Sequence, residues 1–396
     1  MVIRKAFKFR LKPNGQALKF FSQSAGCCRF VWNKALAIQK ERIDNHEFCL
    51  KYTEMAGKLT SWKKQPETTF LNESPSQSLQ QTLKDLDRAL KDAFSKSSPK
   101  QFPVFKKKGL HNSFRIPQGF KFEDDKIFLP KIGWVRFFKS REITGTPKNV
   151  TVSKRGGHWF FSVQTEMEVS DPVHPSTSTI GIDVGVKRFA TLSDGSFIEP
   201  LSSFKKLESK LTKEQRRLSR KVKFSNNWKK QKHKVSKVHI KIADARNDFL
   251  HKTSTTICKN HAVVMLEDLK ISNMVRSAKG TLESPGQNVK AKSGLNKSIL
   301  DQGWFEFRRQ IEYKQTWSGG QVVVVPPNYT SQTCPVCGNV SRENRLSQSN
   351  FRCVECGFQL NADHNAACNI LAVGQTVLAR GETGAVRPLA RESHRL

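Results

Sequence analysis

Residues 178–195, STIGIDVGVKRFATLSDG, contain two short apolar runs separated by a glycine-containing bend. The pattern predicts a strand, a turn and a second strand that ends at Asp194-Gly195, because β-branched residues favour strands and glycine favours tight turns. Asp183 lies in the middle of the first predicted strand. An unpaired charge beside a core strand is costly. Asp183 is therefore a candidate functional residue.

Two further acids have similar surroundings. Glu267 ends the apolar run Val263–Leu266, which predicts a buried strand, and Asp363 begins the predicted helix 363–373. Each acid alone has a structural explanation: a strand-end cap for Glu267, a helix N-cap for Asp363 and a core hydrogen-bond acceptor for Asp183. Together they predict a site for two Mg²⁺ ions. Such a pair activates water and stabilises the leaving oxygen of a phosphodiester, so the three acids favour a nuclease.

The nine cysteines are too sparse for a disulfide scaffold. Four of them have the spacing C-x2-C-x15-C-x2-C, which is typical of a zinc ribbon: Cys334, Cys337, Cys353 and Cys356. A glycine follows each pair and allows the tight turns that direct the sulfurs to one ion. Because four protein ligands close the coordination shell, we expect one structural Zn²⁺. The other cysteines have no metal spacing and predict buried or free thiols in a reduced, cytosolic protein.

The chain is strongly basic. It has 68 Lys and Arg residues against 34 Asp and Glu residues, a formal net charge of +34, and 37 % hydrophobic residues. Such an excess repels itself unless a polyanion neutralises it, so nucleic acid is the expected partner. A membrane surface is the alternative, but the basic residues are spread along the chain instead of forming one amphipathic anchor. The longest apolar runs are too short to cross a bilayer, and the N-terminus MVIRKAFKFRL lacks a signal-peptide core.

A large share of this charge falls in residues 201–257, which predict two helices joined by the turn FSNNW at 224–228. Residues 201–241 contain fifteen Lys and Arg residues and two acids. We expect this hairpin to bind phosphates, and a solvated basic face is the alternative. Residues 275–297 are polar and contain Gly, Ser and Pro, which predicts a flexible loop or lid.

The N-terminal part of the chain changes character twice. Residues 1–11 alternate in part as a half-buried strand would, and residues 14–97 predict helices, with leucines recurring every three or four residues after Pro75. Residues 98–170 contain short apolar stretches separated by turn signals, which predicts a small β-barrel. The aromatic and basic residues interleaved there suit a nucleic-acid surface or an ordinary β core with a basic exterior.

Several stretches together carry a resemblance to a known family: GIDVGVKRFATLSDG (181–195), LEDL (266–269), TSQTCPVCG (330–338), FRCVECG (351–357) and NADHNAACNI (361–370). Their combination resembles the TnpB family of transposon-encoded proteins, which are similar to type V CRISPR effectors. The similarity extends to SPSQSLQQTLKDLDRAL (74–90) and FPVFKKK (102–108).

The resemblance implies an α+β multidomain fold. It has an OB-like wedge β-barrel with a helical recognition insert, and an RNase H-like (RuvC) α/β nuclease domain interrupted by the zinc ribbon. The expected domains are the wedge barrel (1–13 and 98–175), the recognition domain (14–97), the nuclease domain (176–330 and 358–375, with the hairpin 201–257 and the lid 275–297), the zinc ribbon (331–357) and a disordered tail (376–396).

The resemblance also implies an activity, which is RNA-guided cleavage of double-stranded DNA beside a short transposon-associated motif. The three RuvC acids would be Asp183, Glu267 and Asp363, holding two catalytic Mg²⁺ ions. The guide RNA would be transcribed from the transposon end. We expect a monomer on RNA, in the cytoplasm of a bacterium or archaeon and associated with the nucleoid. Contacts to nucleic acid are expected at Gln80, Gln81, Lys84, Lys106, Lys107, Lys108, Arg216, Arg217, Arg220 and Lys221.

Two other functions are the alternatives. A recombinase that joins transposon ends would use the same acids, because one metal pair serves either water or a 3′-hydroxyl as nucleophile. A non-catalytic guide-directed DNA-binding regulator would require a broken triad, whereas all three acids are present in this chain.

Overall fold

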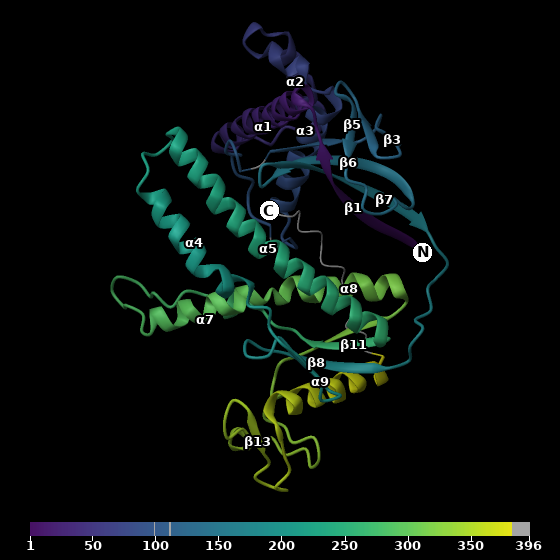
Figure 1. Ribbon diagram of the computed structural model, residues 1–396, viewed down its shortest axis with the longest axis vertical. Coiled ribbons are helices and arrows are strands. Elements are labelled where there is room, and N and C mark those ends of the chain that lie inside the picture. Colours follow the sequence, from purple (N-terminus) through teal and green to yellow (C-terminus); the bar gives the residue numbers. More distant parts are fainter. Residues whose placement is uncertain (99, 111, 382–396) are drawn as a thin grey trace. The chain divides into compact units, whose positions relative to one another are not determined.

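The computed structural model of the protein describes residues 1–98, 100–110 and 112–381 (Figure 1). The chain divides into two compact units, one of residues Met1–Ser170 and one from Asp171 onward. The predicted wedge and recognition domains fall in the first unit, apart from residues 171–175, and the predicted nuclease domain and zinc ribbon fall in the second. Among the described residues, no helix has both the length and the apolar character needed to cross a bilayer.

The first unit contains a seven-stranded sheet in the order β2-β6-β7-β1-β5-β4-β3. Its strands are β1 (Val2–Lys12), β2 (Ser113–Ile116), β3 (Lys121–Glu123), β4 (Lys126–Leu129), β5 (Gly133–Phe137), β6 (Thr146–Arg155) and β7 (His158–Glu168). The N-terminal strand β1 is central, because it pairs antiparallel with β7 and, at its end, with β5. Closure of this sheet into an OB-like barrel stays a prediction.

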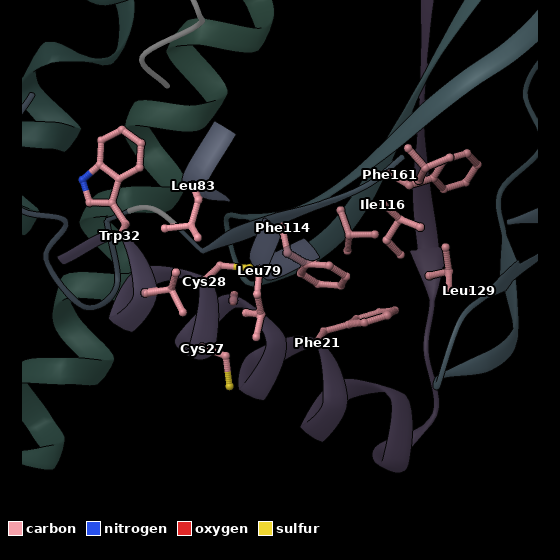
Figure 2. Packing of buried hydrophobic residues seen from close by; sticks show 14 of the residues in the cluster. Phe21, Cys27, Cys28, Trp32, Leu79, Leu83, Phe114, Ile116, Leu129 and Phe161 are labelled. Carbon is pink, nitrogen blue, oxygen red and sulfur yellow. The ribbon is translucent and has the colours of Figure 1, made fainter. Parts of the chain in front are cut away.

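Helices pack against this sheet in one hydrophobic core. They are α1 (Gly15–Asp44), α2 (Tyr52–Lys64), the 3-10 helix η1 (Pro66–Glu73) and α3 (Ser76–Phe94). The evenly spaced leucines of α3 are buried, and Figure 2 shows Leu79 close to Phe21 of α1 and Phe114 of β2, with Leu83 nearer Trp32. Helix α1 begins where the side chain of Asn14 accepts a hydrogen bond from the Ala17 amide. The recognition helices and the sheet therefore share their core.

The second unit contains a five-stranded sheet in the order β10-β9-β8-β11-β12. Its strands are β8 (Thr179–Val184), β9 (Ala190–Leu192), β10 (Phe197–Ile198), β11 (Val263–Glu267) and β12 (Gln321–Val325). Strand β11 runs parallel to both β8 and β12, while β9 is antiparallel to β8. The stretch 178–195 thus forms the antiparallel pair of β8 and β9 in a mixed sheet. An RNase H-like topology stays a prediction.

Helices cover both faces of this sheet. The described helices of the second unit are α4 (Ser203–Ser219), α5 (Asn226–Asn260), α6 (Ile271–Met274), α7 (Val289–Gln302), α8 (Trp304–Ser318) and α9 (Ala362–Ala379). Helices α5, α8 and α9 pack with the strands, whereas α4 packs on α5. Val264 and Leu266 pack with residues of α5 and α8, whereas Met265 packs with Ile370 of α9. This alternation follows from the two-residue period of a strand. Helix α9 therefore lies on one face, and α5 and α8 lie on the other (Figure 1).

Two sequence-based expectations about flexible segments are wrong in part. The predicted lid 275–297 is helical from Val289, because Lys292 and Asn296 donate hydrogen bonds to the carbonyls of Met274 and Val275 and Ile299 is buried. The predicted disordered tail 376–396 begins inside α9, because Val377 and Leu378 pack with the cluster around Met265. The rest of that tail, from residue 382, lies outside the described residues.

Candidate active site and metal centre

The register of β8 and β11 places two acids side by side. Ile182 is paired with Leu266 in the parallel ladder, so Asp183 and Glu267 come next at the carboxyl ends of neighbouring strands. Ile182 and Leu266 are buried in the cluster that includes α5 and α8. Because side chains alternate along a strand, Asp183 and Glu267 point to the opposite face, which α9 covers.

Helix α9 brings the third acid to this face. The helix lies so close to β8 that a Cβ added at Gly181 would be 2.4 Å from the Ala367 carbonyl oxygen, which excludes any larger residue there. Asp363 is in the first turn of α9. The sequence also allowed it to be the N-cap of this helix, but it does not have that role. The cap is Asn361, whose Oδ1 accepts hydrogen bonds from the amides of Asp363 and His364 at 3.1 and 3.3 Å. The Asp363 carboxylate is therefore not used for capping.

The three carboxylates interact electrostatically. Burial, together with the negative charges of Glu267 and Asp363, raises the pKa of Asp183 to about 8. Burial also raises the pKa of Glu267, against the lowering effect of a hydrogen bond from Thr330. Such repulsion between buried acids is what a divalent cation relieves, and carboxylate oxygens are the ligands that Mg²⁺ prefers. The chemistry of the three donors therefore suits Mg²⁺, although their oxygens do not all lie within 4.8 Å of one another as the four cysteine sulfurs do.

Two residues that the sequence analysis missed complete this cluster. The Thr330 hydroxyl donates a 2.6 Å hydrogen bond to Oε1 of Glu267. Nη2 of Arg345 lies 3.9 Å from Oδ1 of Asp363, and its positive charge also lowers the pKa of Asp183. Thr330 opens the motif TSQTCPVCG, which was a usable signal. Arg345 is one basic residue among many, and no local pattern distinguishes it.

Two asparagines of α9 hold the segment that carries Thr330. Asn369 donates from Nδ2 to the carbonyls of Thr330 and Thr333, both at 2.8 Å. Asn365 donates to the same Thr333 carbonyl at 3.1 Å. Both asparagines are buried, one turn apart on the helix. Helix α9 therefore contributes Asp363 and also positions the hydroxyl that holds Glu267.

The four predicted zinc ligands come together. Their sulfur atoms all lie within 4.8 Å of one another, with 3.6 Å between Cys334 and Cys356 and 3.5 Å between Cys337 and Cys353. Four sulfurs at about 2.3 Å from one ion would be about 3.8 Å apart, so the cluster fits a tetrahedral Zn²⁺. It is the only group of His, Cys, Asp or Glu side chains this tight in the part of the chain that the structure describes.

The two cysteine turns have the same geometry. Gly338 and Gly357 have φ angles of 75° and 71°, a left-handed conformation that favours glycine. In the first turn the Cys334 amide donates to the Asn339 carbonyl, and in the second the Cys353 amide donates to the Phe358 carbonyl, both at 2.8 Å. The hairpin of β13 (Asn350–Arg352) and β14 (Gln359–Asn361) then leads directly into α9. The ribbon is thus continuous with the helix that carries Asp363.

The predicted nucleic-acid contacts of the first unit have different environments. Gln80 and Lys84 are exposed on α3, whereas the Gln81 side chain donates to Asp85 at 3.0 Å. The ammonium of Lys106 lies 3.6 Å from the centre of the Trp32 ring. Lys107 and Lys108 are exposed.

Gln81 and Lys106 line a small polar pocket of about 80 Å³. Its lining also includes the cations Arg29 and Arg115 and one acid, Asp85. Arg115 pairs with Asp85 at 3.2 Å, which leaves an excess of positive charge around the pocket.

The predicted contacts of the second unit lie at the end of α4 and just beyond it. Arg216, Arg220 and Lys221 are exposed. Arg217 is also exposed but pairs with Glu214 at 3.1 Å. Helices α4 and α5 pack through Leu211, Val235, Val238 and Ile242, which form a separate small core.

Three protein-family profiles match the chain. Residues 162–278 match OrfB_IS605, described as "Probable transposase", and residues 304–370 match the Cas12f1-like TNB domain. Residues 1–47 match a family described as a helix-turn-helix domain, although the structure has the strand β1 and the single continuous helix α1 there.

Individual relatives extend over nearly the whole chain. "Putative RNA-guided DNA endonuclease InsQ" of Escherichia coli K12 is 56 % identical over 390 residues, covering 98 % of this chain and 96 % of the relative. A "Putative RNA-guided DNA endonuclease" of Streptomyces pristinaespiralis is 34 % identical, covering 99 % and 94 %. The fold is similar to that of Cas12f1 in a cryo-EM structure of its complex with sgRNA and target DNA, with a TM-score of 0.52 at 15 % identity, covering 93 % and 98 % of the two chains.

Proposed function

This chain belongs to the TnpB family of transposon-encoded proteins, and on that premise we propose that it is an RNA-guided DNA endonuclease. A guide RNA transcribed from the transposon end would pair with one strand of a double-stranded target. Base pairing would read the sequence, while the protein would read backbone shape and a short motif beside the target. The net charge of +34 supports polyanionic partners of this kind.

The observation that supports the proposal is the electrostatic interaction of three acids from β8, β11 and α9. Asp183, Glu267 and Asp363 would hold two Mg²⁺ ions, which would activate water and stabilise the leaving oxygen of the cut phosphodiester. The raised pKa of Asp183 supports a cation at this place, because burial and the charges of the other two acids both disfavour its ionised form.

Other residues of this chain would act around the acids. Thr330 would hold the Glu267 carboxylate in one orientation through its 2.6 Å hydrogen bond. Arg345, at 3.9 Å from Asp363, would partly neutralise the acids before metal binds. Its guanidinium is then available to a phosphate of the DNA backbone once metal occupies the acids. The zinc ribbon would have a structural role, holding Arg345 and the segment after Thr330 beside α9.

The remaining parts of the proposal concern the nucleic acids. The sheet of the first unit would be the OB-like wedge, with α1 to α3 as its recognition insert. The pocket near Gln81 and Lys106 would contact a DNA or RNA phosphate, and the exposed cations of α4 would contact another. The sheet of the second unit would be the RuvC domain. We expect one protein per guide RNA, in the cytoplasm of a bacterium or archaeon.

The test starts from protein expressed together with its flanking DNA. RNA that copurifies is sequenced, and the complex is given a plasmid carrying the matching target and a library of adjacent motifs in Mg²⁺ buffer. We expect guide-dependent cleavage by the wild type and none by Asp183→Asn, with guide-dependent DNA binding retained. Asp194→Asn is the matched control, because this acid accepts hydrogen bonds from Ser196 in a nearby turn.

Two results would overturn the proposal. Equal cleavage by wild type and Asp183→Asn would remove the role of the three acids. Joined transposon ends, formed without RNA, would favour a recombinase.

A further inference from the structure

The segment that joins α4 to α5 exposes an aromatic ring. We call residues 222–228 the hairpin tip. The Phe224 side chain in it is 66 % exposed and the neighbouring Val222 is 79 % exposed. Phe224 has a φ of 69°, a left-handed conformation that is unusual for a bulky residue. The backbone thus holds a large apolar ring in solvent.

A second aromatic ring and two ammonium groups lie beside it. The ring centres of Phe224 and Trp228 are 5.5 Å apart, with an interplanar angle of 58°. Lys223 lies 5.3 Å from the centre of the Phe224 ring, and Lys232 lies 5.0 Å from that of Trp228. The tip therefore combines aromatic surface with positive charge at close range.

The surrounding hairpin carries cations without acids. Residues 215–243 contain no Asp or Glu. They contain eleven exposed basic residues: Arg216, Arg217, Arg220, Lys221, Lys223, Lys229, Lys230, Lys232, Lys234, Lys237 and Lys241. A single exposed ring is common on protein surfaces. Two rings surrounded by cations, with no acid nearby in the sequence, form a surface that favours binding of a polyanion.

The tip is also distant from the core of the second unit. Leu250 and Ile257, near the other end of α5, are buried in that core. At the rise of an α-helix, Trp228 lies about 33 Å along the helix axis from Leu250. The arms are held together near the tip by Gln231, whose side chain donates a 2.6 Å hydrogen bond to Glu214. Figure 1 shows the loop between α4 and α5 at the end of the hairpin away from β8 and β11.

We propose that the hairpin tip is a stacking site for an unpaired nucleobase of a single-stranded nucleic acid. Phe224 and Trp228 would contact the face of the base, and the flanking lysines would contact its phosphates. Base stacking on aromatic rings tolerates any sequence, because every base has a π-face. The inference deepens the proposed function, in which a guide RNA and a displaced DNA strand both offer unpaired bases.

The first experiment measures binding of full-length protein to fluorescently labelled single-stranded RNA and DNA of mixed sequence, over a range of salt concentrations. Phe224→Ala and Phe224→Leu should weaken binding about 5- to 100-fold, which corresponds to one lost stacking contact. Phe224→Tyr keeps the ring and should bind as the wild type does. Val222→Ala, at the same tip but without a ring, is the matched control.

The salt dependence separates stacking from charge. Loss of the ring should leave the slope of log affinity against log salt unchanged, because no phosphate contact is removed. Lys229→Gln with Lys230→Gln should reduce that slope. An oligonucleotide with abasic sites, and heparin, should bind the Phe224→Leu variant and the wild type equally.

A crosslink identifies the site directly. Oligonucleotides with 5-iodouracil, irradiated on the wild-type protein and digested, should give a peptide containing residues 222–228 joined to uracil. The RNA and DNA arms show which strand supplies the base.

The inference is overturned if the Phe224→Leu variant binds as tightly as the wild type, or if heparin binding falls equally. Phe224-dependent binding to anionic vesicles in place of oligonucleotides would indicate a membrane contact instead. A protein that stacks bases at Phe224 but does not cut DNA would leave this site in place and reject only the endonuclease function.

Discussion

The Thr330 hydroxyl donates a 2.6 Å hydrogen bond to Oε1 of Glu267, across 63 residues of sequence. The bond joins the last residue of β11 to the segment that leads into the zinc ribbon. The Thr330 carbonyl in turn accepts from Asn369 of α9. One chain of hydrogen bonds therefore links two of the three elements that carry acids.

The first prediction concerns this hydroxyl. Thr330→Val keeps the shape of the side chain but frees the Glu267 carboxylate, so cleavage should fall about 10- to 100-fold and require more Mg²⁺. Thr330→Ser should restore both. Thr333→Val is the control, because that hydroxyl donates only to the Tyr329 carbonyl. An unchanged Mg²⁺ titration for Thr330→Val would show that the hydrogen bond has no positioning role.

Arg345 allows a second prediction, because its guanidinium lies 3.9 Å from the Asp363 carboxylate. Arg345→Ala should lower cleavage about 10²- to 10³-fold, since a preorganised positive charge for the phosphate is lost. Binding of Mg²⁺ should not weaken, because the substitution removes a like charge from beside the metal ligands. Calorimetry on protein without nucleic acid measures Mg²⁺ binding, and a plasmid assay measures the cleavage rate. The control is Arg342→Ala, an exposed residue three positions away, which should cleave as the wild type does. Weaker Mg²⁺ binding by Arg345→Ala would contradict this account.

The third prediction is a dependence of stability on pH. The pKa of Asp183 is about 8 in the folded chain against an ordinary 3.8, so between these values the folded state holds a proton that the unfolded state has lost. Stability of the Mg²⁺-free protein should therefore fall as the pH rises from about 4 to 8 through this group, at up to about 1.4 kcal/mol per pH unit.

Asp183→Asn removes this titration. The variant should melt several degrees above the wild type at pH 8 in buffer without Mg²⁺, and the difference should shrink toward pH 5. Adding Mg²⁺ should raise the melting temperature of the wild type more than that of the variant. Thermal denaturation followed by circular dichroism measures both, and a difference that grows toward low pH would contradict the assignment.

The fourth prediction concerns the cysteine cluster. Elemental analysis should find one Zn per chain, and Cys334→Ser should lose the metal and most of the cleavage, because the ribbon holds Arg345 and the Thr330 segment in place. Cys49→Ser is the control, since this thiol lies outside the cluster. A Cys334→Ser protein that cleaves normally without zinc would show that the ribbon does not support the acidic site.

Elements with strong local patterns could be predicted. The leucine stripe of α3 and the strand of Val263–Leu266 follow from periodicity, since a helix or strand buries one face at a fixed spacing. The helix over 289–302 could not be predicted. Its polar composition is typical of a loop. The helix is stabilised by tertiary hydrogen bonds from Lys292 and Asn296 to carbonyls of the preceding segment.

The candidate site was partly predictable. Each acid stood out because it interrupts or ends an apolar element in a chain poor in acids. Asp363 could equally have been a helix cap, and only the hydrogen bonds to Asn361 show that its carboxylate is free of that role. No sequence pattern predicted that Thr330 contacts Glu267 or that Arg345 lies beside Asp363.

By itself the sequence determined the four cysteines of the cluster, the basic character and the three candidate acids, because each depends on residue type and short spacing along the chain. The tertiary structure alone decided that Asp183 and Glu267 are neighbours, that Asp363 joins them, and that Thr330 and Arg345 contact them. Those contacts depend on the register of β8 with β11 and on the close approach of α9 to Gly181, which bring together residues far apart in sequence.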